Sequence, residues 1–197
     1  MKYIIIVLSL FVTIQSFGAS DKEPDFELPD FGYVFELTDQ LQKISGEQVN
    51  MFGIRGGLTF NTNYAVGFSF KFSTNRILPA DEIDKNVFLN VALTSAYIEY
   101  TLKPSSRVHL TFPLDIGGGD VNMEWKEYRS SDPFPYGEKY FFYVEPGAKL
   151  EIAITKKLLI NLGATYVFVP KLDYRAVTAK NISGPSAIVG IKYGKFL

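Results

Sequence analysis

The sequence contains no cysteine, one histidine and one tryptophan among 197 residues. Without cysteine, the chain can form neither a disulfide nor a thiolate metal site, and its mature N-terminus cannot carry a lipid on a cysteine. The net charge is −1, so no basic surface indicates binding to nucleic acid. After the first 20 residues, no apolar run approaches the roughly 20 residues that a transmembrane helix needs. Stability must therefore come from the core and the hydrogen bonds of the chain itself.

Residues 1–20 have the layout of a signal peptide. Lys2 supplies the positive n-region, Tyr3 to Val12 the apolar h-region, and Gly18-Ala19-Ser20 a cleavage zone of small residues. The apolar run is about 10 residues long, which is too short to span a bilayer as a helix. We expect cleavage near Ser20 and a single domain over residues 21–197.

The rest of the sequence alternates apolar and polar residues with a period of two. One face of the segment from residue 107 to 116 is formed by Val108, Leu110, Phe112, Leu114 and Ile116. Such alternation predicts strands with one apolar and one polar face. The pattern predicts eight strands, at approximately residues 31–40, 50–61, 64–74, 91–102, 107–118, 140–155, 158–169 and 186–196. Their typical length of about 9 to 12 residues suits tilted membrane strands.

The connections between these strands fall into two classes. Tight turns follow the second, fourth and sixth strands, at residues 61–63, 103–106 and 156–157. Long connections follow the third, fifth and seventh strands, at 75–90, 119–139 and 170–185, and the first connection, around 43–49, is shorter. Short periplasmic turns and long extracellular loops are typical of outer-membrane barrels. We therefore predict an all-β fold, an eight-stranded antiparallel up-and-down transmembrane β-barrel in the outer membrane.

The charged residues of the strands gather on the polar faces. The acids are Glu36, Glu99, Asp115, Glu145 and Glu151, the bases are Arg55, Lys71, Arg107, Lys149 and Lys192, and His109 shares this face. A charge facing lipid at mid-bilayer costs roughly 2–4 kcal/mol. We expect these side chains to point inward and to pair. Because the side chains of an eight-stranded barrel just fill its interior, we predict a plugged interior rather than an open pore.

Periodicity alone does not say which face looks inward. A soluble periplasmic barrel of the lipocalin kind, with an apolar ligand pocket, is therefore an alternative hypothesis. Two observations favour the membrane barrel. The apolar faces are too uniformly large and aromatic to fit inside so small a barrel, and the connections segregate by length.

Catalytic roles have weak support in the sequence. His109 lies on the polar face near a periplasmic turn, where a member of the interior network is the better interpretation than a general base. Glu145 and Glu151 are six residues apart on one strand, or roughly 20 Å, too far for a carboxylate pair. We expect no catalytic residue, cofactor or metal, and keep a lipid-modifying enzyme as a further alternative. The long connection at 119–139, which is the third loop at its end of the barrel, carries aromatic residues that could contact a surface partner or cover the barrel mouth, namely Trp125, Tyr128, Phe134 and Tyr136.

The segment FGIRGGLTFNTNYAVG at residues 52–67 resembles the second hairpin of small outer-membrane β-barrel proteins. The segments at 97–100, 108–114 and 117–119 continue the likeness to uncharacterised eight-stranded relatives of the OmpA/OmpX-type barrels of Gram-negative bacteria. The resemblance implies a non-catalytic role in envelope integrity or surface interaction, contact with outer-membrane lipid and lipopolysaccharide, and insertion by the barrel-assembly machinery. The sequence departs from the family at its end, Phe196-Leu197, where such barrels often have an aromatic last residue.

Overall fold

The computed structural model describes residues 30–79, 81–125 and 136–195. The expected signal peptide, its cleavage site and residues 196–197 lie outside this part. The elements in chain order are β1 (Phe31–Ile44), β2 (Glu47–Phe60), β3 (Tyr64–Ser73), β4 (Val87–Leu102), β5 (Val108–Trp125), β6 (Glu138–Ala153), β7 (Leu158–Val167), β8 (Asp173–Tyr174), β9 (Val177–Thr178), α2 (Ala179–Ile182) and β10 (Gly184–Gly194). No helix within the described ranges is long and apolar enough to cross a membrane.

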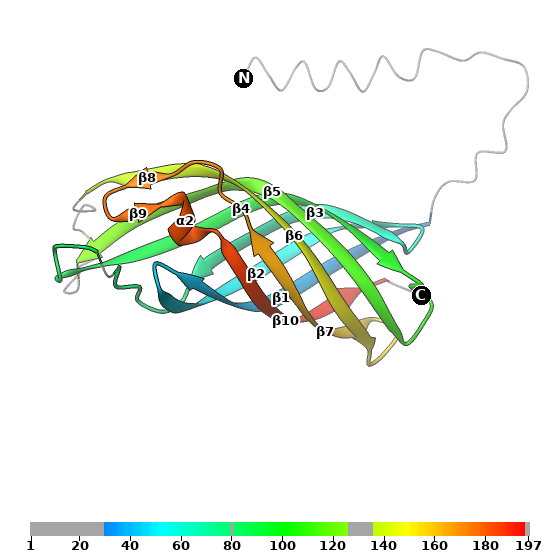
Figure 1. Cartoon of the computed structure of the whole chain (residues 1–197). Helices are drawn as coiled ribbons and strands as arrows, with labels where there is room; N and C mark the ends of the chain where they lie inside the picture. Colours follow the sequence, from blue (N-terminus) through cyan, green and yellow to red (C-terminus); the bar gives the residue numbers. More distant parts are fainter. Residues whose placement is uncertain (1–29, 80, 126–135, 196–197) are drawn as a thin grey trace, which may run out of the picture.

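Eight of these strands form a closed barrel in the order β1-β10-β7-β6-β5-β4-β3-β2. Every pair is antiparallel, and each strand of the barrel lies beside its neighbour in the sequence, apart from the closing pair β1–β10. That closing ladder runs from Val34 opposite Gly194 to Gln42 opposite Ser186. The predicted eight-stranded up-and-down barrel is therefore confirmed. Figure 1 shows β8, β9 and α2 gathered at one end of the barrel, far from the C-terminus.

Several strand boundaries differ from the sequence prediction, and the largest differences have clear physical reasons. The first connection is a two-residue turn, Ser45-Gly46, with φ values of 49° and 89°. Positive φ at both positions suits a tight hairpin turn, so the ladder between β1 and β2 continues to Ile44 opposite Glu47. Strands β4 and β5 have 16 and 18 residues, more than predicted, because their ladder continues up to Val87 opposite Trp125. Strand β6 keeps the predicted length of 16 residues but begins and ends two residues earlier.

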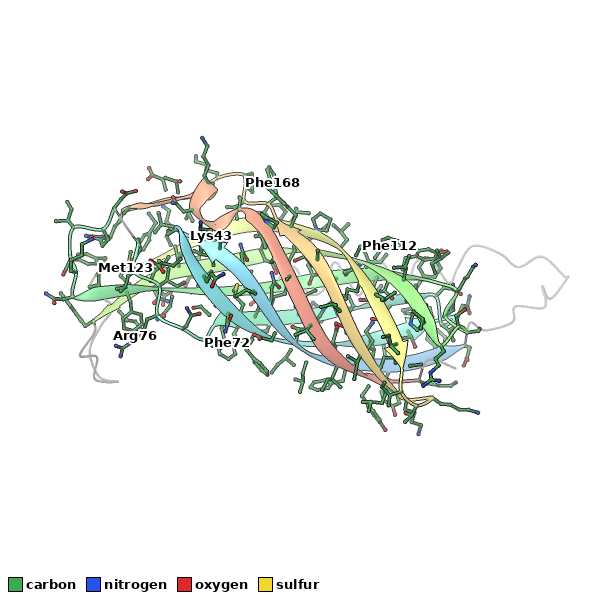
Figure 2. The ribbon with its side chains drawn as sticks, turned by 60° about the horizontal axis from the view of Figure 1, so that its bottom comes forward. Lys43, Phe72, Arg76, Phe112, Met123 and Phe168 are labelled. Carbon is green, nitrogen blue, oxygen red and sulfur yellow. The ribbon has the colours of Figure 1, made fainter. Side chains whose placement is uncertain are left out.

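The apolar faces of the strands point outward, as Phe72, Phe112 and Phe168 do in Figure 2. Aromatic rings meet across neighbouring strands near the short turns, with centroids 5.2 Å apart for Phe31 and Phe60. The pairs Tyr33–Tyr193 and Tyr64–Tyr100 lie at the same end. The pair Phe52–Phe72 lies toward the other end. An outward apolar band with aromatic residues toward both ends is the surface of a barrel that faces lipid.

Candidate functional site

The inward side chains near the short turns form a network of buried charges around Arg55. Its guanidinium contacts three carboxylates from three other strands, at 3.0 Å from Glu36, 3.2 Å from Glu99 and 3.3 Å from Asp115. The ring of Tyr97 lies 4.0 Å from the same guanidinium. An arginine can serve several acids because its five N–H donors point in fixed directions in one plane.

Three lysines extend this network along and across the barrel. Lys149 donates to Glu36 at 2.6 Å, and Lys71 donates to Glu145 at 2.6 Å. Lys192 donates to Glu99 at 2.6 Å and also to Glu151. All these charged side chains are at most 5% exposed. Such groups are tolerated in an interior only when opposite charges and hydrogen bonds satisfy them.

Neutral polar side chains complete the hydrogen bonding. Gln40 donates to Glu145 at 3.0 Å and accepts from Lys71 at 3.1 Å. Thr165 donates to Glu145 at 2.6 Å, and Asn161 donates to Glu36 at 2.8 Å. These neutral residues carry no charge that marks them in the sequence, although their inward positions in the alternation were a usable signal. They make the network continuous between strands that are not neighbours.

Arg107 was expected in this interior and lies outside it. It shares the parity of His109, but β5 begins only at Val108, so Arg107 belongs to a turn and its side chain is exposed. His109 does point inward, with Nε2 3.1 Å from Glu151 and Nδ1 3.0 Å from the carbonyl oxygen of Ser106. The buried network of the described residues thus sets five carboxylates against four lysine or arginine side chains, and His109 is placed to balance the fifth.

A second departure concerns the outward face. Asp39 lies on the exposed apolar side of β1, between Leu37 and Leu41 and opposite Phe52 of β2. Phe52 contacts Phe72, and this pair lies further from the short turns than the Phe31–Phe60 and Tyr64–Tyr100 pairs. Asp39 therefore lies toward the outer end of the apolar band, where a charge costs far less than at mid-bilayer.

The interior changes character toward the long loops, which the charges of the polar faces did not predict. Here the inward residues are apolar and fully buried, as in Val87, Leu89, Val91 and Leu93 of β4. They pack with Val121 and Met123 of β5, Phe141 and Tyr143 of β6, and Leu172, Tyr174, Val177 and Ile182 of the last long connection. We call this cluster the apolar seal. It lies between the charged network and the long-loop end of the barrel.

Three long connections meet above the seal, around Arg175. Its Nε donates to Glu82 at 2.9 Å, and its guanidinium carbon lies 3.5 Å from the ring centroid of Tyr136. Tyr136 in turn donates its hydroxyl proton to Asp84 at 3.0 Å. The hydrogen bond from Arg175 lowers the pKa of the Glu82 carboxyl to about 2. We call Glu82, Asp84, Tyr136 and Arg175 the loop clasp, since it joins segments from 74–86, 136–137 and 168–183.

The predicted aromatic contacts of the third loop fall into two groups. Trp125 and Tyr136 lie together, with ring centroids 6.4 Å apart, at the edge of the loop clasp. Tyr128 and Phe134 lie outside the described residues. The clasp itself had no signal in the sequence, because Glu82 and Arg175 are 93 residues apart in irregular segments.

The arrangement around His109 offers little for catalysis. The adjacent cavity is lined by Glu99, His109, Glu151 and Lys192, and its volume of about 10 Å³ is room for roughly one water. Within the described ranges, no group of three or more histidine, cysteine or acidic side chains is placed to hold a metal. Glu145 and Glu151 bind different lysines, Lys71 and Lys192, as their separation on one strand predicts.

A closed barrel of eight antiparallel strands with apolar residues outside and charges inside defines an outer-membrane β-barrel, and the comparisons with solved structures agree. Neisserial surface protein A (NspA) has 12% sequence identity and a TM-score of 0.59, covering 83% of this chain and 96% of its own. A major outer membrane protein from Thermus thermophilus has 7% identity and a TM-score of 0.52, covering 82% of this chain and 99% of its own. These identities show a shared fold. No family model and no curated protein matches the chain.

Proposed function

We propose that this protein is a non-catalytic outer-membrane barrel with a closed interior, which presents its long loops as a surface for interaction outside the cell. In this orientation the short turns face the periplasm. The filling of the interior by two successive layers supports the proposal most directly. A solute would have to pass the charged network around Arg55 and then the apolar seal, and the two layers exclude different kinds of solute.

The loop clasp supports the surface role. Charge-assisted hydrogen bonds and a cation–π contact fix three loops relative to one another, which lowers the entropy lost on binding. Exposed apolar side chains lie in the same region. Ile83, adjacent to Glu82, is 92% exposed, and Tyr140 at the start of β6 is 72% exposed. Exposed apolar side chains held on a fixed frame are typical of contact surfaces.

Planar-bilayer recording of the refolded barrel tests the closed interior. We expect no conductance steps from protein whose barrel is verified by its shifted migration on SDS gels before boiling. Regular steps from such protein would contradict the closed interior and leave the barrel itself intact.

Complementation of a deletion strain tests the surface role against a role in envelope integrity. The loop variant would carry Ile83→Ser and Trp125→Ala, and a matched control would carry the exposed turn substitution Ser105→Ala. We expect the loop variant to restore the detergent resistance of the cells but not the interaction of the cell surface with an external partner. Failure to restore detergent resistance, by a loop variant that is present in the outer membrane, would instead favour a role in envelope integrity.

The two alternative functions have less support. A soluble ligand-binding barrel needs an apolar pocket inside, whereas the apolar side chains of the strands point outward and the inward ones are charged or packed in the seal. A lipid-modifying enzyme needs catalytic groups near the outer leaflet, and His109 lies at the opposite end beside the turn at 103–107. Unchanged lipid A in the deletion strain would remove the enzyme hypothesis.

A further inference from the structure

Among the residues that the structure describes, the exposed charges at the short-turn end of the barrel are almost all positive. Among the described residues, this end carries one acid, Asp30, which pairs with Lys195 at 2.7 Å. We call its five exposed cations the basic rim: Lys103, Arg107, Lys156, Lys157 and Lys195. The long-loop end differs, because both acids and bases are exposed there, as in Arg76, Asp81, Lys85 and Asp173. The positive sign is thus a property of one end and not of the whole surface.

The basic rim lies directly beside the lipid-facing band. Lys103 follows the outward Leu102, and Arg107 precedes the outward Val108. Lys156 is two residues beyond Ile154, and Lys195 is two residues beyond Tyr193. With a rise of about 3.3 Å per residue, each of these four cations lies within roughly 7 Å of a lipid-facing side chain along the chain. This is the depth of the phospholipid headgroups.

The backbone holds these cations in place around the barrel. The carbonyl oxygen of Arg107 accepts from the amide of Ala153 at 2.8 Å, which ties the β4–β5 turn to β6. The carbonyl oxygen of Lys157 accepts from Gly194 at 3.0 Å, which ties the β6–β7 turn to β10. The basic rim therefore forms an ordered arc from β4 to β10. The remaining turn, at 61–63, carries no charge.

We propose that the basic rim binds the phosphates of anionic phospholipids in the periplasmic leaflet of the outer membrane. This inference rests on the orientation in the proposed function, with the short turns in the periplasm. Lysine and arginine near a membrane surface are attracted to anionic headgroups, and their long stems reach from the apolar edge to the phosphates. The cations follow the circumference instead of lining a concave pocket, which fits a ring of lipids better than one protein partner.

Electron spin resonance with spin-labelled lipids measures this preference directly. The barrel would be reconstituted in phosphatidylcholine, and the association of spin-labelled phosphatidylglycerol would be compared with that of spin-labelled phosphatidylcholine. The rim variant replaces the four turn cations by glutamine: Lys103→Gln, Arg107→Gln, Lys156→Gln and Lys157→Gln. The control replaces four cations of the other end: Lys43→Gln, Arg76→Gln, Lys171→Gln and Lys180→Gln.

For the wild-type barrel, we expect a preference for phosphatidylglycerol of roughly fivefold at each cation-bound lipid position. It should fall as salt is raised, because salt screens exposed charges. The rim variant should show almost no preference, and the control should keep it. A variant with arginine in place of Lys103, Lys156 and Lys157 should also keep it. If the rim variant does not fold, the salt dependence of the wild-type and the arginine variant still test the proposal.

Three results would overturn the proposal. They are equal association of the two lipids with the wild-type barrel, loss of the preference in the control as well as in the rim variant, and retention of isolated peptidoglycan through the rim without a lipid preference. Failure of the proposed function would look different, since conductance steps, or a loop variant that does not restore detergent resistance, would leave the lipid preference of the basic rim unchanged.

Discussion

At the scale of single residues, the interior network makes Arg55 the most connected cation of the barrel. It neutralises carboxylates from β1, β4 and β5 at once, so its loss would leave several buried negative charges close together. Removing one partner of a buried ion pair is far more costly than replacing both. The position therefore carries more of the stability of the barrel than any exposed ion pair can.

We predict that Arg55→Met lowers the free energy of unfolding by roughly 3–5 kcal/mol. The measurement is urea unfolding in detergent micelles or vesicles, followed by the loss of heat-modifiable migration. Arg107→Met is the matched control, because its side chain is exposed outside the network, and we expect a change within about 0.5 kcal/mol. Similar effects of both substitutions would mean that the network around Arg55 adds little.

Two neighbouring glycines of β2 provide a second test at this scale. A Cβ at Gly57 would lie 2.2 Å from the carbonyl oxygen of Val66 and 2.7 Å from the hydroxyl of Tyr97, which packs beneath it. A Cβ at Gly56 meets nothing within 4 Å. We expect Gly57→Ala to cost roughly 1–3 kcal/mol and to disturb Tyr97 over Arg55. Gly56→Ala should refold with near wild-type stability in the same unfolding assay, and a reversed order would show that the two positions are packed differently.

At the scale of elements, the sequence predicted the strands far better than the apolar seal and the loop clasp at the long-loop end of the barrel. Strict alternation fixed the inward and outward residues of β3 and of the parts of β2 and β6 near the short turns, where one face is apolar and the other is polar. In β4, by contrast, Val87, Phe88 and Leu89 are apolar on both faces, so alternation carried no information about the seal. Arg107 was misplaced because parity continues past the end of a strand, whereas the strand does not.

The loop clasp gives a pH-dependent prediction at the element scale. The pKa of Glu82 is about 2 in the folded protein, below the ordinary value of 4.5, so the folded state favours the ionised carboxylate. Its contribution to loop order is complete above about pH 4.5 and is lost as the pH falls toward 2. We expect the fluorescence of Trp125, the single tryptophan, to change in this window because its ring neighbours Tyr136.

Glu82→Gln should remove this acid transition, and Glu47→Gln, an exposed acid of β2, should leave it unchanged. The other groups that face the clasp are Arg175, Tyr136 and Asp84, and Asp84 also carries a carboxylate within reach of Tyr136. If Asp84→Asn removes the transition and Glu82→Gln does not, the titrating group is Asp84 and the assignment to Glu82 is wrong.

At the scale of the whole molecule, closure of the barrel depends on a single pairing between the first and last strands. The ladder between β1 and β10 places Leu37 opposite Ile191, and both side chains face outward. Directly opposed Cβ atoms lie about 4.5–5.5 Å apart, whereas diagonal neighbours two residues away are about 7–8 Å apart. A disulfide needs Cα atoms roughly 4.4–6.8 Å apart, which the directly opposed Cα atoms of an antiparallel pair satisfy at about 4.5–5.5 Å and diagonal residues do not. Because the chain has no cysteine of its own, an engineered pair reports this register without interference.

We predict that Leu37→Cys with Ile191→Cys forms a disulfide on mild oxidation of the folded barrel in membranes. After boiling without reductant, the cross-linked chain should migrate faster than the reduced chain, because the disulfide joins β1 to β10 across most of the sequence. The off-register pair Leu37→Cys with Tyr193→Cys should stay largely reduced under the same conditions. Preferential cross-linking of the second pair would shift the closing ladder by two residues and move Lys192 away from Glu36 and Glu99, so the test also examines the register on which the buried charge network depends.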